Sequence, residues 1–327
     1  MRNLLIVGCN TLMRNIIKKV ASHKYQRTKV AEKHIYKTFQ KKACVIAHVN
    51  SEGSRVLFKN RDRNYSPELK VYHTLRRGVE IVYMKDENTG WVEGVNEFGI
   101  GLVNSALMVL WDEKEGGKGK GKKNDSATLG IVGSKDAKRI LRALECETLE
   151  KAMEELISFE GGIRGHTIVS DGVRAFSLEH TAKHAPYYQE ILEDEILVRS
   201  NHGSKYPDAG YTIGENALSS KRRMQITLET LPNLKIEEIA PSLYSQKYVD
   251  VGSPFNVVRK TDNMYTSSQI VLDLKSKKMV LYLIPEEASF LGVSIDKEIE
   301  QAKCSFEVKE FSFFDEAGGF EIKNVVY

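Results

Sequence analysis

Cysteine and proline are scarce in this chain. Only four of the 327 residues are cysteines, they are widely spaced, and none forms a CxxC pair, so neither a disulfide framework nor a cysteine-rich zinc site is indicated. The histidines show no ligand spacing either, and we therefore expect neither a metal nor another cofactor. The four cysteines are Cys9, Cys44, Cys146 and Cys304.

Long apolar runs are missing as well. A helix that spans a bilayer needs roughly 18 apolar residues in a row, and nothing in the chain approaches that length. The short run at 4–7 is also too short for the core of a signal peptide, which takes roughly 7 to 15 residues. We therefore expect no membrane segment and no secretion signal, and a reducing, cytoplasmic setting. Targeting to an organelle by the basic first segment stays open.

Acidic residues are almost absent from the first 43 positions. This leader holds eleven Lys and Arg against one acid, Glu32, whereas the remainder holds 37 basic and 43 acidic residues. Such asymmetry is typical of an arm that binds nucleic acid or a membrane surface, of a targeting peptide, or of a detachable pro-segment lying on an acidic body. Charge alone leaves these alternatives open.

The order of the hydrophobic patterns favours layered sheets. Strand-like runs come first, two helices follow, strands return after residue 165, and a polar helix is expected over 219–231 before a last hairpin over 265–283. Because strands come in runs, we predict an α+β protein with two stacked, mainly antiparallel sheets. The Lys/Gly-rich stretch at 112–126 is typical of a flexible solvated loop. The early strands are expected over 44–49, 55–58, 79–83, 91–96 and 100–105, and the helices over 134–144 and 148–159.

Cys44 heads a strand-like run directly behind the leader. A turn at 50–53 and a second strand bring the chain back to Asp62, so a nucleophile and a carboxylate would share one hairpin. If the Ala43–Cys44 bond were broken, Cys44 would carry both a thiol and an α-amine whose ordinary pKa of roughly 7.7–8.0 suits a general base. The break would follow attack of the thiol on the preceding carbonyl, and the leader would then be a pro-segment.

Four short motifs carry a resemblance to a known family. They are Cys44 with Asn60-Arg61-Asp62, the run Gly94-Val95-Asn96-Glu97-Phe98-Gly99 leading to Asn104, Ser200-Asn201-His202, and Ser219-Ser220-Lys221-Arg222-Arg223. With these motifs the chain resembles the N-terminal nucleophile (Ntn) hydrolases of the penicillin V acylase and bile salt hydrolase type. It is most similar to their relatives around the acyl-coenzyme A:isopenicillin N acyltransferase, the linear amide hydrolases. The resemblance runs from residue 44 to about residue 283, in the family's order.

The resemblance implies a four-layer αββα sandwich formed by one domain over 44–327, and it implies roles for five residues. Cys44 would be the nucleophile, and Asp62 would accept a hydrogen bond from its amine. Asn104 and Asn201 would form the oxyanion hole, whose donors stabilise charge that develops on the carbonyl oxygen. Arg223 would support the thiolate.

Departures from the family's pattern concern the same hairpin. Bile salt hydrolases have Arg before their Asn-x-Asp, where this chain has Lys59, and the middle position is usually aromatic but is Arg61 here. Asn60 and Arg61 are therefore possible supporting residues, and the Arg61 cation could reach the thiol or face solvent. Asn201 could instead cap a strand, and Arg223, next to two other cations, could lie on a solvated helix face.

We expect a hydrolase of linear amides that is activated by its own cleavage and acts through an acyl-enzyme on Cys44. One alternative is acyl transfer from the same intermediate to an amine or a thiol. Another, from a different class, is a structural or nucleic-acid-binding protein that uses the basic leader. The expected partner is a small amide or acyl substrate, with no membrane involved, and a homo-oligomer stays open.

Overall fold

The structure is a computed structural model, and it describes residues 42–63, 67–107, 138–158, 165–181, 184–244, 255–261, 264–284, 307–313 and 320–325. Most of the leader, the loop at 112–126, Cys9 and Cys304 lie outside these ranges. The expected pro-segment, the flexible loop and the single domain over 44–327 therefore stay predictions. Among the described helices, none is long and apolar enough to cross a membrane.

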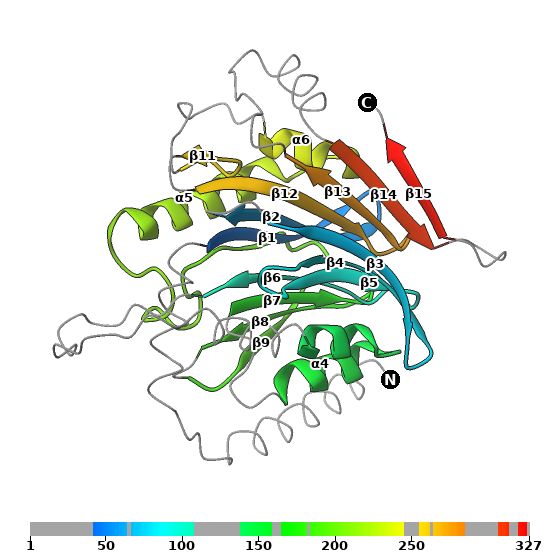
Figure 1. Cartoon of the computed structure of the whole chain (residues 1–327). Helices are drawn as coiled ribbons and strands as arrows, with labels where there is room; N and C mark the ends of the chain where they lie inside the picture. The colour runs from blue at the N-terminus through cyan, green and yellow to red at the C-terminus, as the bar shows by residue number, and fades with distance from the viewer. Residues whose placement is uncertain are drawn as a thin grey trace, which may run out of the picture.

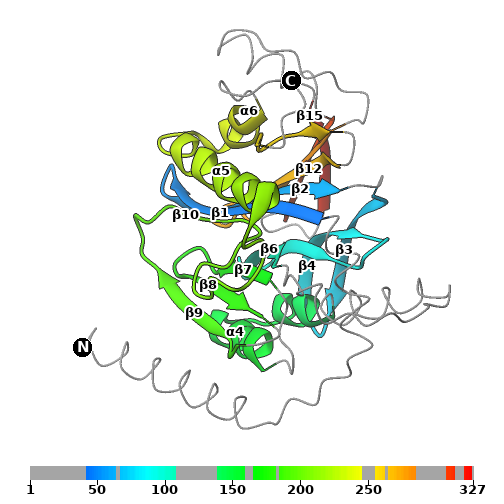
Figure 2. The same ribbon diagram turned by 90° about the vertical axis from the view of Figure 1, so that its left-hand side faces the viewer.

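One sheet holds eight strands in the described part of the chain, in the order β10-β1-β2-β12-β13-β14-β15, with β11 paired to β12. All of its pairings are antiparallel. The neighbouring strands β1 and β2 lie near one edge of this sheet, between β10 on one side and β12 on the other (Figure 2). The strands are β1 (Lys42–Ser51), β2 (Ser54–Arg63), β10 (Leu197–Arg199), β11 (Lys260–Thr261), β12 (Met264–Asp273), β13 (Lys278–Leu283), β14 (Glu307–Phe313) and β15 (Phe320–Val325).

The second sheet is an antiparallel meander in which seven described strands pair in chain order. It lies against the first sheet, as Figure 1 shows. Each strand joins its sequence neighbour, which is the usual outcome when connections are short. The strands are β3 (Leu69–Arg76), β4 (Val79–Asp86), β5 (Val92–Asn96), β6 (Gly101–Ala106), β7 (Gly165–Ser170), β8 (Ala175–His180) and β9 (Tyr187–Ile191).

Helices cover the outer faces of both sheets (Figures 1 and 2). The helical residues 138–144 and α4 (Leu149–Ile157) pack on the β3–β9 sheet, while α5 (Gly214–Thr230), the short η2 (Ile236–Glu238) and α6 (Ile239–Tyr244) pack on the other. Three apolar layers result, one under each helix layer and one between the sheets. The predicted α+β fold with two stacked antiparallel sheets between helix layers is confirmed.

A two-residue turn fixes the register of the β1–β2 hairpin. Glu52 and Gly53 have φ of 54° and 73°, the left-handed conformation that both central residues of a type I′ hairpin turn adopt. The register that follows pairs Cys44 with Arg61 and Ala43 with Asp62. The strand therefore begins before Cys44 and runs through the expected cleavage point.

Side chains on this hairpin alternate between two buried faces. Ile46 and Leu57 lie in the apolar layer between the sheets, which we call the inter-sheet face. Val45 and Phe58 lie in the layer beneath α5 and α6, which we call the helix-side face. Since successive side chains of a strand point to opposite sides, Cys44 belongs to the inter-sheet face together with its cross-strand partner.

Candidate active site

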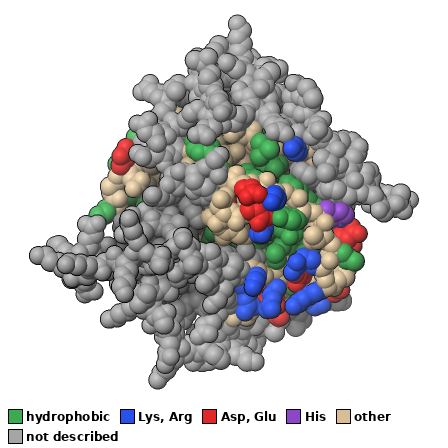
Figure 3. All heavy atoms as spheres, viewed as in Figure 1, with side chains coloured by type: hydrophobic (Ala, Val, Ile, Leu, Met, Phe, Trp, Pro, Cys, Tyr) green, Lys and Arg blue, Asp and Glu red, His purple; other side chains and the backbone are tan. Residues whose placement is uncertain are grey.

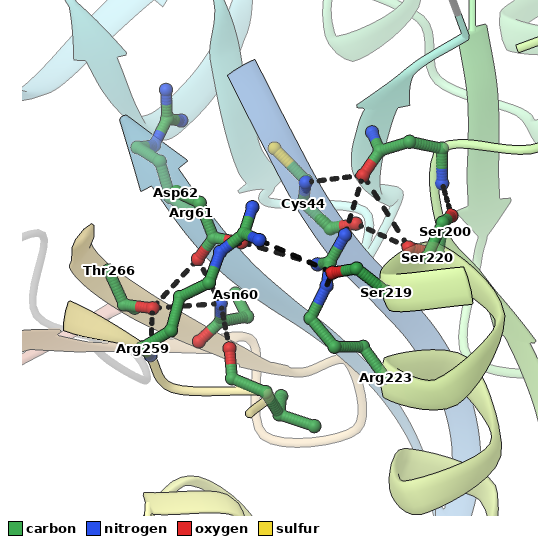
Figure 4. Close-up of polar contacts among 12 residues, drawn as sticks. Cys44, Asn60, Arg61, Asp62, Ser200, Ser219, Ser220, Arg223, Arg259 and Thr266 are labelled. Atoms are coloured by element: carbon green, nitrogen blue, oxygen red, sulfur yellow. Dashed lines mark hydrogen bonds and ion pairs between the residues drawn. The ribbon is translucent and has the colours of Figure 1, made fainter. Parts of the chain in front are cut away.

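Cys44 is buried, with 3% of its surface exposed, and its backbone N–H is held by a side chain far away in the sequence. The N–H donates to Asn201 Oδ1 at 3.0 Å, and the Ser200 hydroxyl donates to the Cys44 carbonyl oxygen at 3.1 Å. These bonds attach β1 to the residues that follow β10 (Figure 4). Asp62 is expected to accept a hydrogen bond from the free amine of a cleaved Cys44, and this stays a prediction. In the uncleaved chain, the acceptor of the peptide N–H is Asn201.

The sulfur of Cys44 faces a set of buried charges between the sheets. Arg63 Nη1 lies 3.6 Å from Cys44 Sγ, and Figure 4 shows the sulfur and the Arg61 guanidinium on the same side of the hairpin. Lys59 belongs to the same face because it alternates with these two arginines along β2. The sulfur is thus placed beside a row of cations on the neighbouring strand.

Two carboxylates of the opposite sheet pair with this row. Lys59 Nζ and Arg61 Nη2 each donate to the Glu93 carboxylate. Asp86 Oδ2 accepts from Arg63 Nε at 3.1 Å and from Arg61 Nη1 at 3.4 Å. All five side chains are buried, and each ion pair joins β2 to β4 or β5. We call Lys59, Arg61, Arg63, Asp86 and Glu93 the inter-sheet charge cluster.

The charge balance of this cluster favours a thiolate. It holds three cations and two carboxylates, so an ionised Cys44 would make the set neutral. Burial raises the pKa of the Cys44 thiol, but Lys59 and Arg63 lower it by more, and the net result is a pKa below the ordinary value. Burial also lowers the pKa of Lys59, to about 8, although Glu93 acts in the opposite direction.

Asp62 is the centre of a second cluster, on the helix-side face. Its Oδ1 accepts from Asn60 Nδ2 at 2.6 Å and from the Thr266 hydroxyl at 2.7 Å. Its Oδ2 lies 3.1 Å from Arg259 Nε and 3.2 Å from Arg223 Nη1. Two cations and two neutral donors therefore surround one fully buried carboxylate, as Figure 4 shows. We call these five residues the helix-side cluster.

Asn201 connects Cys44 to the helix-side cluster. Its Oδ1 accepts from the Cys44 N–H and, at 3.1 Å, from Arg223 Nη2, while Arg223 in turn reaches Asp62. Its Nδ2 donates to the Ala106 carbonyl at 2.8 Å and to the Ser105 hydroxyl at 3.4 Å. Both amide hydrogens of Asn201 are therefore engaged in this state.

Arg223 is buried, with 1% of its surface exposed. It does not lie on the solvated face of α5, whereas Lys221 and Arg222 are exposed. Burial lowers the pKa of Arg223 to about 10, and the neighbouring Arg259 acts in the same direction. Its side chain bonds Asn201, Asp62 and the Ser219 hydroxyl, and its expected support of the thiolate stays a prediction.

Asn104 lies at the other end of the site, on β6. Its Nδ2 donates to the Val92 carbonyl at 2.9 Å, and its Oδ1 accepts from Lys59 Nζ at 3.2 Å. It is thus tied to the inter-sheet charge cluster, and its hydrogen bonds in the described structure do not reach Cys44. Asn96, from the same sequence motif, bonds only backbone groups in the described structure, including Ile100 N and the Leu144 carbonyl, and so holds a turn.

The structure thus brings Cys44, Asn201, Arg223 and Asp62 into one chain of hydrogen bonds and places Asn104 next to Lys59. Sequence reasoning missed Arg63, Arg259 and the two carboxylates, Asp86 and Glu93. One signal was available for Arg63: Lys59, Arg61 and Arg63 alternate in a strand, which places three cations on one face. No local sequence pattern marks Arg259, Asp86 and Glu93 as partners of β2.

Within the described residues, no group of three or more His, Cys, Asp or Glu could hold a metal ion.

Comparisons with known proteins concern the fold. The sequence matches no protein-family model and no curated protein. Among solved structures, it is similar to a mutant of the conjugated bile acid hydrolase from Clostridium perfringens, with a TM-score of 0.47 and 13% identity over 87% of this chain and 97% of that one. It is also similar to penicillin V acylase from Agrobacterium tumefaciens, with a TM-score of 0.36 and 12% identity over 86% and 91% of the two chains.

Proposed function

We propose that this protein is an Ntn-type amidohydrolase that cleaves linear, non-peptide amides through an acyl-enzyme on Cys44. One observation carries the proposal. The Cys44 sulfur lies 3.6 Å from Arg63 within a buried cluster whose charges a thiolate would balance, while the Cys44 nitrogen is held by Asn201. A cysteine that only fills space in a core needs neither arrangement.

In the proposed reaction, the thiolate of Cys44 attacks the carbonyl carbon of the amide. The carbonyl electrons move to oxygen, the C–N bond breaks as the intermediate collapses, and the nitrogen leaves with a proton as the free amine. Water then attacks the thioester, releases the carboxylic acid and returns the thiol. The proton that the leaving nitrogen requires would come from the protonated α-amine of a mature Cys44, which is the base in the first step.

The amide groups proposed as oxyanion donors, those of Asn104 and Asn201, already donate to protein acceptors. Asn201 Nδ2 donates to Ala106 and Ser105, and Asn104 Nδ2 donates to Val92. For Asn201 to act in the proposed oxyanion hole, the substrate oxygen has to replace one of its two acceptors. Lys59 Nζ, already beside Asn104, adds positive charge at the same end of the site.

We propose that maturation uses the same nucleophile. The sulfur attacks the Ala43 carbonyl carbon, the Ala43–Cys44 C–N bond breaks, and water hydrolyses the thioester to leave a carboxylate on Ala43 and an amine on Cys44. Asn201 Oδ1 already accepts a hydrogen bond from the Cys44 nitrogen at 3.0 Å. The same oxygen would accept from the new amine and leave its lone pair directed away from Asn201.

The test combines intact-mass measurement with amino-terminal sequencing of the purified protein. We expect a chain that begins at Cys44 for the wild type and an uncleaved leader for Cys44→Ala, which should also lack amidase activity on a panel of acyl-amide substrates. Cys146→Ala is the matched control, because burial raises the pKa of Cys146 to about 11 and leaves it a poor nucleophile. Full activity in Cys44→Ala would disprove the proposal.

Acyl transfer uses the same acyl-enzyme and differs only in the acceptor. An amine or thiol would attack the thioester in place of water and carry the acyl group away. A thioester substrate offered with increasing concentrations of an amine would separate the two reactions. Hydrolysis predicts a constant yield of free acid, whereas transfer predicts that the acylated amine replaces it.

A further inference from the structure

A polar cavity lies at the edge of the sandwich. It has a volume of about 150 Å³ and is lined by residues of β8 and β9 in one sheet, by Arg199 of β10 in the other, and by the segment that follows β10. Both β9 and β10 are edge strands of the described sheets, so the cavity opens where the two sheets end. It is separate from Cys44 and lacks the five residues of the inter-sheet charge cluster in its lining.

The polar lining interrupts the apolar layer between the sheets. On β8, Phe176 and Leu178 face the helix-covered core, so Ser177 and Glu179 face the opposite sheet. Elsewhere on that same face Ile168 and Ala175 are apolar. Packing alone favours an apolar residue at such positions, because a buried polar group has to find partners.

The one carboxylate in the cavity is already compensated. Glu179 accepts hydrogen bonds from three successive backbone N–H groups, those of Ser204 at 2.9 Å, Lys205 at 2.8 Å and Tyr206 at 3.1 Å. Oriented backbone donors stabilise a carboxylate without any cation. The charge of Glu179 thus fixes the loop and does not require the cations beside it.

The cavity is lined by two cations, Arg199 and Lys205, and neither forms an ion pair with a described residue. Arg199 Nη1 donates to the Val198 carbonyl at 3.0 Å, and the Lys205 ammonium lies 4.9 Å from the centre of the Tyr187 ring. Burial lowers the pKa of Arg199 from its ordinary value even though Glu179 acts in the opposite direction. The hydroxyl of Ser177, on the cavity wall, has no hydrogen-bond partner among the described residues. A cavity with two such cations and a spare hydroxyl is complementary to an anion.

We propose that this cavity binds a small oxyanion, a carboxylate, phosphate or sulfate group, between Arg199 and Lys205, with the Ser177 hydroxyl as a further donor. Arg199 and Lys205 both line the cavity, and Lys205 is exposed to solvent. The inference does not rest on the proposed amidase activity. A bound anion would also order the segment 199–206, which carries Asn201.

Calorimetric titration of the full-length Cys44→Ala protein tests this site without turnover. Sodium acetate, phosphate and sulfate are titrated separately, at constant ionic strength with chloride as the balancing anion. We expect saturable binding of at least one of them, and a loss of about tenfold or more in affinity for Arg199→Gln and for Lys205→Gln, since each removes a charged hydrogen-bond donor. Acetate alone would identify a carboxylate site, and phosphate or sulfate alone a site for a tetrahedral anion.

Arg222→Gln is the matched control, because Arg222 is an exposed cation on α5 outside the cavity. It should leave the affinity unchanged. The Lys205 side chain is exposed, so Lys205→Gln stays informative even if Arg199→Gln does not fold. The proposal is overturned if none of the three anions binds saturably, if Lys205→Gln binds like the unmodified cavity, or if Arg222→Gln weakens binding equally.

Discussion

The two faces of the β1–β2 hairpin carry buried charge in opposite arrangements. On the inter-sheet face, three cations of β2 pair with carboxylates of the opposite sheet, around the sulfur of Cys44. On the helix-side face, β2 supplies the single carboxylate, Asp62, and Arg223 and Arg259 come from elsewhere. Two strands of ten residues thus hold a cationic row on one side and an anion on the other.

The two faces of the hairpin therefore act on different parts of Cys44. The inter-sheet face acts on the sulfur, since Lys59 and Arg63 lower the pKa of the thiol. The helix-side face holds the backbone, since Arg223 and Asn201 lead from Asp62 to the Cys44 nitrogen. The molecule's surface shows no such separation: on the face drawn in Figure 3, acidic and basic side chains of described residues lie next to one another.

The largest expected effect comes from Asp62→Asn, which tests whether the helix-side face is structural. The change leaves Arg223 and Arg259 buried without their carboxylate, and breaking a buried pair in this way costs about 3–5 kcal/mol. Urea unfolding should show a loss of that size. Cys44 should stay reactive, because Asp62 raises the pKa of the thiol and its removal cannot weaken the thiolate.

Asp208→Asn is the control for this change. Asp208 pairs with His184 at 2.8 Å on the surface, with 53% of its side chain exposed, so its loss should alter the free energy of unfolding by less than about 1 kcal/mol. Equal effects of the two substitutions would show that the helix-side cluster contributes no more than a surface pair.

A smaller effect, on acid stability, is expected from His48, which continues the inter-sheet face away from the site. Burial lowers the pKa of His48 from 6.5 to about 4, with Arg55 acting in the same direction. The unfolded chain therefore binds a proton below about pH 6.5 that the folded chain does not bind. The stability that neutral His48 provides is complete above pH 6.5 and is lost as the pH falls toward 4.

At pH 5 this loss amounts to about 2 kcal/mol relative to pH 7. Unfolding measured across this range should show a shallower pH dependence in His48→Gln than in the wild type. His73→Gln is the control, because His73 lies on β3 with 30% of its side chain exposed. An unchanged slope in His48→Gln would show that the inter-sheet face tolerates a proton at this position.

The smallest effect concerns the sulfur itself. Arg63→Gln removes the cation 3.6 Å from Cys44 Sγ, so the pKa of the thiol should rise. Alkylation of Cys44 by iodoacetamide at pH 7 should slow by about tenfold, and the half-maximal rate should move to higher pH. Arg55→Gln, which removes a buried cation from the start of β2, should leave the rate unchanged. Equal rates in all three proteins would assign the reactivity of the thiol to another group.

Much of the fold could be predicted because its signals are local. Period-two patterns identified the strands, and the turn after residue 50 correctly placed Cys44 and Asp62 in one hairpin, although the strands run further than the pattern indicated. The helix expected over 219–231 runs over Gly214–Thr230, since its first turn is too polar to reveal a start. These features depend on neighbours a few residues apart.

The site was less predictable, because burial of a charge depends on what lies opposite. Three adjacent cations on α5 look alike in sequence, yet only Arg223 is buried, since it alone faces Asp62. Arg61 could have faced solvent or the thiol. It points between the sheets because Glu93 and Asp86 lie there.

The sequence by itself determined the two stacked sheets, the hairpin that joins Cys44 to Asp62, and the row of cations on alternate positions of β2. Only the tertiary structure decided which charges meet, and it showed that Asn201 accepts from the peptide N–H of Cys44 in the uncleaved chain. The physical reason is distance along the chain. Local patterns follow from backbone geometry, whereas a buried charge is stable only beside partners that folding brings from remote strands and helices.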